Sequence, residues 1–152
     1  MSQSLAKIYV HFVFSTKHRI PSLHSQDLRN QLYAYMATIA RNNVDSPAVI
    51  INGVEDHVHL LLRLSRKFAV MNVVQECKVE TSKWLKDQPK VPSDFAWQGG
   101  YGAFSVSPSD VDEVKAYIQN QEEHHKHISF QDEFRELCRI HGLELDERYV
   151  WE

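Results

Sequence analysis

The chain has 152 residues, the length of one domain, and its 43% hydrophobic and 24% charged residues exclude an intrinsically disordered protein. The net charge of −3 argues against a uniformly basic nucleic-acid-binding protein. The charges are unevenly placed, however, because residues 1–108 carry 12 basic and 8 acidic side chains and residues 109–152 carry 5 and 12. A mildly basic body therefore precedes an acidic tail, and phosphate binding is not excluded.

The first half of the chain predicts a strand, a helix and a pair of strands. Alternating apolar and polar residues predict a strand over residues 5–15, and apolar residues at helical spacing predict a helix over residues 27–42. β-Branched residues predict a strand over residues 48–52, and a turn joins it to a further strand over residues 57–64.

The second half predicts two further helices around an extended stretch, followed by a helical segment in the acidic tail. One helix covers residues 68–86 and ends before two prolines, and residues 95–106 are aromatic and extended. Ser107 and Pro108 predict the start of a helix that runs to about residue 125. The last helical stretch covers residues 130–140.

This order, β-α-β-β-α-β-α, predicts an α+β fold of the ferredoxin-like class. We expect a split β-α-β sandwich with an antiparallel sheet, helices on one face, the other face open, and an added C-terminal helix. The fold by itself predicts no chemistry.

The triplet His57-Val58-His59 is the most informative short motif. Because side chains alternate faces along a strand, both imidazoles point the same way and stand close enough to chelate one cation. The spacing alone is a weak signal, since a second such triplet, His125-Lys126-His127, lies in a polar segment that we interpret as a solvated surface run. The alternative is that His57 and His59 are two polar residues on an open sheet face.

Tyr117 and Gln121 form the second candidate pair. They lie four residues apart on the helix that Ser107 begins, hence on the same side of it. A phenol and an amide so placed can present a nucleophile and a metal ligand together, although a tyrosine and a glutamine at the edge of the core would look the same. A divalent ion held by His57, His59 and Gln121 would activate a phosphate for attack by Tyr117 and leave coordination positions open.

Five segments, in this order, resemble the single-tyrosine HUH transposases of the IS200/IS605 insertion-sequence family, which act on single-stranded DNA. They span nearly the whole chain. The segments are STKHR (residues 15–19), DHVHLLL (56–62), CKVETSKWLK (77–86), WQGGYGAFSVS (97–107) and SPSDVDEVKAYIQNQEEHH (107–125).

The resemblance implies that Tyr117 is the catalytic nucleophile and that His57, His59 and Gln121 bind the metal, Mg²⁺ or Mn²⁺. It implies cleavage that leaves a 5′-phosphotyrosine and a free 3′-hydroxyl, with DNA hairpins as the recognised partner. It also implies a homodimer in which the tyrosine helix of one subunit completes the histidine pair of the other. Residues 1–128 would form the catalytic domain, and residues 129–152 its acidic tail.

Contacts with DNA are expected from a basic turn and from one helix, whose side chains can reach phosphates. These residues are Lys17, His18 and Arg19 in the turn and Lys78, Ser82 and Lys83 on the helix. Two other functions remain open: a catalytically silent relative that binds hairpins, and a small-molecule-binding module of the same fold in which the histidines are incidental.

The chain is expected to be cytoplasmic. It contains no apolar run near the length of about 18 residues that spans a membrane, and residues 1–4 begin no secretory signal. Cys77 and Cys138 form no C-x-x-C pair, which is typical of reduced thiols.

Overall fold

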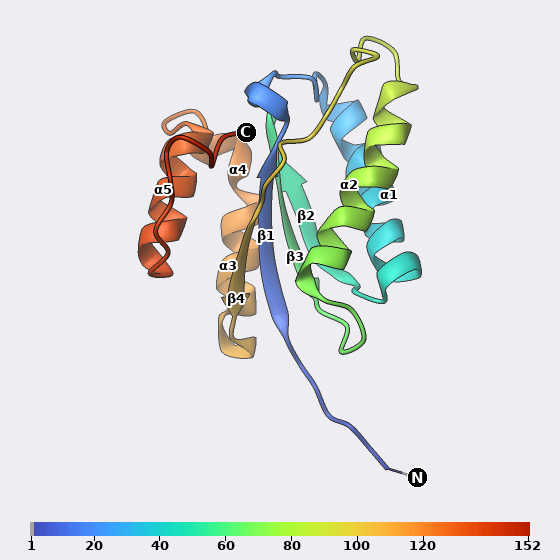
Figure 1. The fold of residues 1–152 in the computed structure, drawn as a ribbon, viewed down its shortest axis with the longest axis vertical. Coiled ribbons are helices and arrows are strands. Elements are labelled where there is room, and N and C mark those ends of the chain that lie inside the picture. Colours follow the sequence, from blue (N-terminus) through green and yellow to red (C-terminus); the bar gives the residue numbers. More distant parts are fainter. Residues whose placement is uncertain (1) are drawn as a thin grey trace.

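The computed structural model describes residues 2–152 and contains one antiparallel sheet of four strands in the order β2-β3-β1-β4 (Figure 1). This strand order confirms the predicted ferredoxin-like class. Within residues 2–152, no helix has the length and apolar character that crossing a membrane requires. The elements are β1 (Tyr9–Ser15), η1 (Lys17–Arg19), α1 (Gln26–Val44), β2 (Ala48–Gly53), β3 (His57–Arg63), α2 (Val70–Lys86), β4 (Gly102–Val106), η2 (Pro108–Asp110), α3 (Val111–Gln119), α4 (Gln121–His124) and α5 (Phe130–Ile140).

The central strands β1 and β3 are buried on both faces. The even-numbered residues of both strands point toward α1 and α2 and fill the larger core, whose strand members are Val10, Phe12, Phe14, Val58, Leu60 and Leu62. Each such side chain gains about 1.5–3 kcal/mol from complete burial. The odd-numbered residues, among them His57 and His59, therefore point to the opposite face.

That opposite face is not open, contrary to the sequence-based expectation. Helices α3, α4 and α5 cover it, as Figure 1 shows on the far side of the sheet from α1 and α2. Phe130 and Phe134 of α5 pack with Val13 and Phe104 of the sheet. The sequence analysis predicted a helix over residues 130–140 but not that it packs on the sheet. The reason is that α5 lies in the acidic tail, where charged residues surround its short apolar stripe.

Gly102 lets α5 approach the sheet closely. A Cβ atom at this position would lie 2.8 Å from Cε2 of Phe134 and 2.9 Å from Cε2 of Phe104, which is closer than real Cβ atoms approach. The absence of a side chain at Gly102 therefore allows the Phe134 ring to pack against β4.

The helix predicted to run from Ser107 to residue 125 is divided at Asn120. Asn52 of β2 donates hydrogen bonds from Nδ2 to the backbone oxygens of Ile118, at 2.9 Å, and Gln119, at 3.2 Å. These oxygens lie at the end of α3, and α4 begins after Asn120. The side chain of Asn52 thus ties the end of the tyrosine helix to the sheet.

The extended stretch over residues 95–106 forms a strand only from Gly102 onward. Before it, Trp97 makes an isolated bridge with Thr16 and donates from Nε1 to the Thr81 hydroxyl at 3.1 Å. The stretch is also bonded to the end of the chain, because the Gly99 amide donates to the Glu152 backbone oxygen at 2.7 Å. Residues 130–152 therefore pack on the rest of the chain.

Candidate active site

His57 and His59 lie on the same face of β3, with their ring centroids 5.2 Å apart. Both side chains are fully buried, so the expectation of rings on an open sheet face is wrong. The reason is that α5 packs over them. Their surroundings are polar, however, and include a carboxylate that the sequence analysis did not single out.

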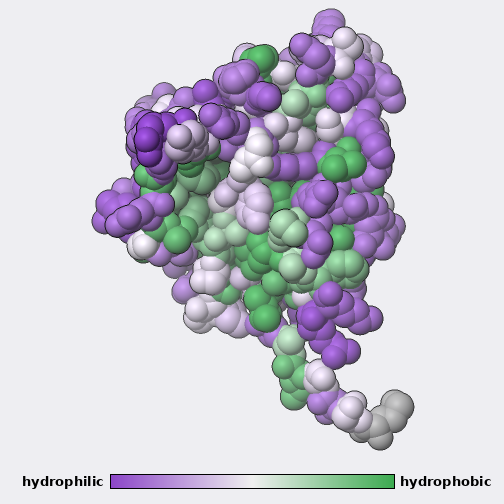
Figure 2. All heavy atoms as spheres, viewed as in Figure 1, coloured by the Kyte–Doolittle hydropathy of each residue, from purple (hydrophilic) through white to green (hydrophobic). Residues whose placement is uncertain are grey.

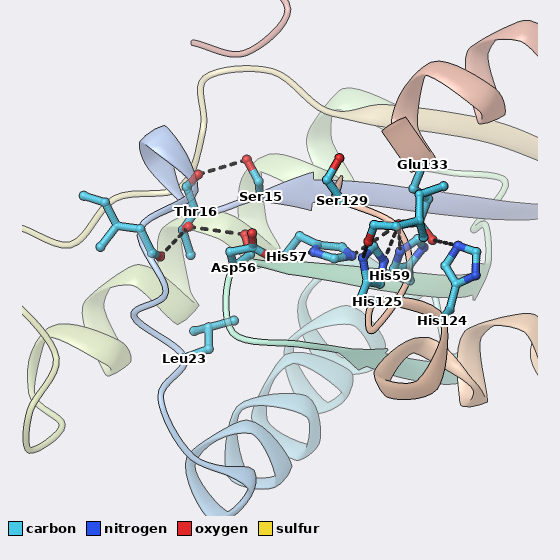
Figure 3. A network of polar contacts seen from close by, with 12 residues as sticks. Ser15, Thr16, Leu23, Asp56, His57, His59, His124, His125, Ser129 and Glu133 are labelled. Atoms are coloured by element: carbon cyan, nitrogen blue, oxygen red, sulfur yellow. Dashed lines mark hydrogen bonds and ion pairs between the residues drawn. The ribbon is translucent and has the colours of Figure 1, made fainter. Parts of the chain in front are cut away.

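Glu133 of α5 places its carboxylate among the histidines (Figure 3). Its Oε1 lies 2.9 Å from Nε2 of His59, 2.9 Å from Nε2 of His125 and 3.3 Å from Nε2 of His57. The Glu133 side chain is 1% exposed. The interpretation of residues 125–127 as a solvated surface run is therefore wrong for His125, which belongs to this cluster, and holds for the exposed His127.

Tyr117 reaches the same carboxylate from α3. Its hydroxyl donates to Oε2 of Glu133, and its ring centroid lies 5.9 Å from that of His59. His124 also faces Glu133, with 3.4 Å between His124 Nε2 and Oε2. One chain thus brings the tyrosine and the histidine pair together.

Neighbouring side chains orient the two β3 histidines. Asp56 Oδ1 lies 2.7 Å from Nδ1 of His57, and His11 Nε2 lies 2.8 Å from Nδ1 of His59. Because each Nδ1 is engaged, each Nε2 is directed toward Glu133. Histidines that bind metals are oriented in this way by a partner on the other ring nitrogen.

Gln121, the third expected ligand, is fully buried at the start of α4. Its Nε2 lies 3.5 Å from the Tyr117 backbone oxygen. Among the described residues, Gln121 Oε1, His57 Nε2 and the Tyr33 hydroxyl are the buried side-chain atoms without a hydrogen-bond partner. Two of these three belong to the expected ligand set. His57 Nε2 faces the Glu133 carboxylate at 3.3 Å without forming a hydrogen bond, Gln121 Oε1 has no hydrogen-bond partner, and leaving buried polar atoms without hydrogen bonds is costly. The residues present therefore fit a cation.

The pKa values reflect burial around a single carboxylate. Burial opposes protonation of His57, but the hydrogen bond to Asp56 and the nearby Glu133 outweigh it and raise its pKa to about 8. Burial lowers the pKa of His59 and of His11. Burial opposes ionisation of Glu133, but the surrounding histidines hold its pKa well below the usual range. Burial and the Glu133 charge raise the pKa of Tyr117, so its hydroxyl stays protonated here.

These shifts predict that the free energy of unfolding in EDTA is highest near pH 6.5. As pH rises from 6.5 through about 8, native His57 loses a proton that unfolded His57 has already lost, which costs on the order of 2 kcal/mol of stability. Below pH 6.5 the unfolded chain protonates His11 and His59 while the native chain resists protonation, so stability again falls.

Urea unfolding at pH 5, 6.5 and 8 measures how the free energy of unfolding depends on pH. Asp56→Asn should flatten the alkaline side of this dependence, and stability that rises steadily from pH 6.5 to 8 would contradict the assignment.

A cavity of about 430 Å³ adjoins Tyr117 between α3 and α5. Its wall includes both apolar and acidic side chains and reaches Glu133. Figure 2 shows that apolar side chains gather on this face beside the hydrophilic surface of α5. The lining residues include Val106, Val114, Tyr117, Leu137, Ile140, Asp110, Glu113 and Glu136.

The basic turn expected to contact DNA forms the 3-10 helix η1, directly after β1. Lys17 and His18 are exposed, whereas Arg19 donates from Nη1 to the Trp151 backbone oxygen at 3.1 Å. The turn lies near the histidine cluster, because the Thr16 amide donates to the backbone oxygen of Asp56 at 2.8 Å.

The second expected group of DNA contacts lies on α2, across the sheet from the histidines. Lys78 Nζ donates to the backbone oxygens of Gln98, at 2.8 Å, and Gly100, at 2.6 Å, and burial lowers its pKa to about 8. Ser82 is partly buried and Lys83 is exposed. Lys78 thus holds the loop before β4 in this structure, and Lys83 is the freer cation.

Comparison with known proteins supports the same family as the motifs. The family model described as "Transposase IS200 like" matches residues 4–121, a range that includes His57, His59, Tyr117 and Gln121 but ends before His125 and Glu133. A search of the curated proteins finds no match.

Two solved structures share the fold. A candidate transposase from Deinococcus radiodurans R1 is 22% identical, with a TM-score of 0.59, over 80% of this chain and 98% of its own. A REP-associated tyrosine transposase bound to a REP hairpin is 13% identical, with a TM-score of 0.59, over 84% of this chain and 76% of its own. Because the family model covers most of the sequence, the chain belongs to the IS200-like transposase family.

Proposed function

We propose that this transposase cleaves and rejoins single-stranded DNA through a covalent bond between Tyr117 and a 5′-phosphate. The observation that carries the proposal is the meeting of the Tyr117 hydroxyl and the His57–His59 pair, which come from α3 and β3, at one carboxylate. A tyrosine at the edge of the core needs no such partners, so the convergence favours a reactive site over incidental packing.

His57, His59 and Gln121 would hold the divalent cation, Mg²⁺ or Mn²⁺. When bound, the cation supplies charge withdrawal from a phosphate oxygen and orients the phosphorus for in-line attack. Imidazole ligands favour Mn²⁺ over Mg²⁺. Asp56 and His11 keep the two imidazoles turned toward the cation by engaging each Nδ1.

Tyr117 would carry out the covalent step. Its Oη loses its proton and forms a bond to phosphorus while the bond from phosphorus to the 3′-oxygen breaks. The 3′-oxygen takes up a proton to leave a free hydroxyl, so that the step releases one proton and consumes one. The phosphotyrosine conserves the energy of the broken bond, so attack by a 3′-hydroxyl can reverse the step without a nucleotide cofactor. Glu133 accepts the Tyr117 hydroxyl in this structure, and the reacting phosphate requires the same place, so α5 must shift before cleavage.

The DNA partner would carry a hairpin, as in the similar structure bound to a REP hairpin. Lys17, His18 and Arg19 would position the backbone beside the Asp56–His57 end of β3, with Lys78, Ser82 and Lys83 contacting a more distant part of the DNA. We propose that the protein acts in the cytoplasm and pairs as a homodimer.

The test uses two hairpin-bearing single strands, one labelled at the 3′ end and one at the 5′ end, incubated with the protein and Mn²⁺. We expect the 3′ label to become linked to protein and the 5′ label to be released on a shorter strand with a 3′-hydroxyl. Tight binding without linkage would overturn the proposal and favour a catalytically silent hairpin-binding protein. That alternative has one observation in its favour, the raised pKa of Tyr117.

Each chain of a dimer is expected to carry its own complete site, because Tyr117 reaches His59 and Glu133 within one chain. Mixing Tyr117→Phe protein with His57→Ala protein should therefore yield no adduct above that of either variant alone. The measurement is adduct formation after the two proteins are unfolded together and refolded. Recovery of activity would instead indicate that the tyrosine helix is exchanged between subunits, as the family resemblance implies.

A further inference from the structure

We propose that the histidine pair has a second cation-binding arrangement, in which His57, His59, His125 and Glu133 enclose a four-coordinate ion of the Zn²⁺ class. The inference rests on the proposed function only in that both arrangements share His57 and His59. One ligand atom from each of these four residues lies within 4.8 Å of every other, and three of the residues are buried.

All three histidines are oriented for this arrangement. Nδ1 of His57 is engaged by Asp56, and Nδ1 of His59 by His11. Nδ1 of His125 lies 2.8 Å from the backbone oxygen of Ile128. Each ring therefore directs Nε2 toward Oε1 of Glu133, the fourth proposed ligand. Histidines that bind metals are held in this way through the other ring nitrogen.

The donor set indicates the class of cation. Three imidazole nitrogens and one carboxylate oxygen make four ligands of the kind that Zn²⁺ takes in tetrahedral sites. Mg²⁺ prefers six oxygen ligands, several of them from water, and therefore fits poorly among buried imidazoles. Co²⁺ accepts the same ligands as Zn²⁺ and has visible absorption that reports the number of ligands.

Closing the site in this way has a structural consequence. His57 and His59 belong to β3, whereas His125 and Glu133 belong to the segment that leads into α5 and to α5 itself. An ion held by all four residues joins α5 to the sheet and leaves no coordination position for a phosphate. The open arrangement with Gln121 would serve DNA, and the closed arrangement would exclude it.

Titration with Co²⁺ tests the closed arrangement on the full chain without DNA. We expect the intense visible bands of four-coordinate Co²⁺, and their displacement by one equivalent of Zn²⁺. Glu133→Gln and His125→Ala should each weaken affinity by at least about tenfold, since even partners of metal ligands contribute 10–100-fold. The matched controls are Glu136→Gln, on the same helix, and His127→Ala, the neighbouring exposed histidine. Neither control should change the spectrum.

A stability measurement protects the test against variants that fold poorly. Zn²⁺ at a hundredfold excess over Kd should raise the Tm of the unmodified protein by about 5–10 °C. At the same Zn²⁺ concentration the increase should be at most about half as large in Glu133→Gln, provided that the far-ultraviolet circular dichroism of this variant matches that of the parent.

The outcomes separate this inference from the proposed function. Weak bands of six-coordinate Co²⁺ in the unmodified protein, unchanged by Glu133→Gln, overturn the closed arrangement even when Mn²⁺ supports adduct formation. Four-coordinate bands that depend on Glu133 and His125 support it even when no DNA adduct forms. When both are observed, Zn²⁺ should also suppress the Mn²⁺-dependent adduct.

Discussion

Tyr117→Phe protein is expected to form no covalent adduct with DNA, while its affinity for the hairpin stays within about twofold of the parent, because phosphate and hairpin contacts determine affinity. Phenylalanine preserves the ring that packs near His11 and His59, with centroids 6.3 and 5.9 Å away. It removes only the hydroxyl that would attack phosphorus. Denaturing electrophoresis of 3′-labelled DNA measures the adduct, and fluorescence anisotropy measures binding.

The matched control is Tyr101→Phe, which removes a hydroxyl from an exposed ring outside the histidine cluster. This variant should form the adduct at the parental rate. An adduct that persists in Tyr117→Phe but disappears in Tyr101→Phe would identify Tyr101 as the nucleophile. Loss of hairpin binding in Tyr117→Phe would show instead that the hydroxyl supports the DNA-binding conformation.

His57→Ala should reduce the rate of cleavage by about a thousandfold or more, because losing a cation that stabilises transition-state charge costs several kcal/mol. The same change should also lower the free energy of unfolding by about 1–3 kcal/mol, since His57 is fully buried and its loss leaves Asp56 without a partner. Urea unfolding and the adduct assay, run on the same preparation, measure the two effects.

His127→Ala provides the comparison, because His127 is exposed and lies outside the cluster. It should change neither the cleavage rate nor the unfolding curve. Cleavage by a folded His57→Ala protein within tenfold of the parental rate would contradict a role for His57 in binding the cation.

Much of the site follows from local rules that the sequence displays. The two-residue period of a strand places His57 and His59 on one face, and helical spacing places Tyr117 near Gln121 along one side of the chain. Which elements meet across the sheet is not a local property. The link between the two pairs came from the chemistry that a shared cation would allow and from the family resemblance. The structure then joins them through a residue that lies beyond the matched range.

Glu133 was missed because its role depends on α5 folding back over the sheet. A signal does exist: Phe130, Phe134 and Cys138 recur at four-residue spacing, and Glu133 lies on the same buried side of the helix. A carboxylate in an apolar stripe needs a partner of opposite character, which directs attention to the histidines elsewhere in the chain. His125 was missed for the same reason, since its burial also depends on this helix.

The fold was predicted well at the level of element type and poorly at some boundaries. α1 extends to Val44, because Asp45 adopts the left-handed conformation that ends it, rather than stopping at residue 42. Apart from the single Thr16–Trp97 bridge, the extended stretch before β4 does not pair as a strand, because its backbone groups bond to the Lys78 side chain and to Glu152 at the end of the chain. Such endings are decided by tertiary contacts that residue patterns do not contain.

The position of Glu133 depends on Gly102, which leaves room for the Phe134 ring beside β4. This residue has no polar side-chain atom, yet the approach of Phe134 that it permits sets how far the helix bearing Glu133 stands from the strand bearing the imidazoles. The distance between the Glu133 carboxylate and the imidazoles thus depends on the packing of Phe134 against Gly102. A larger residue at position 102 would therefore press on the helix that bears Glu133 without replacing any of the ligand residues.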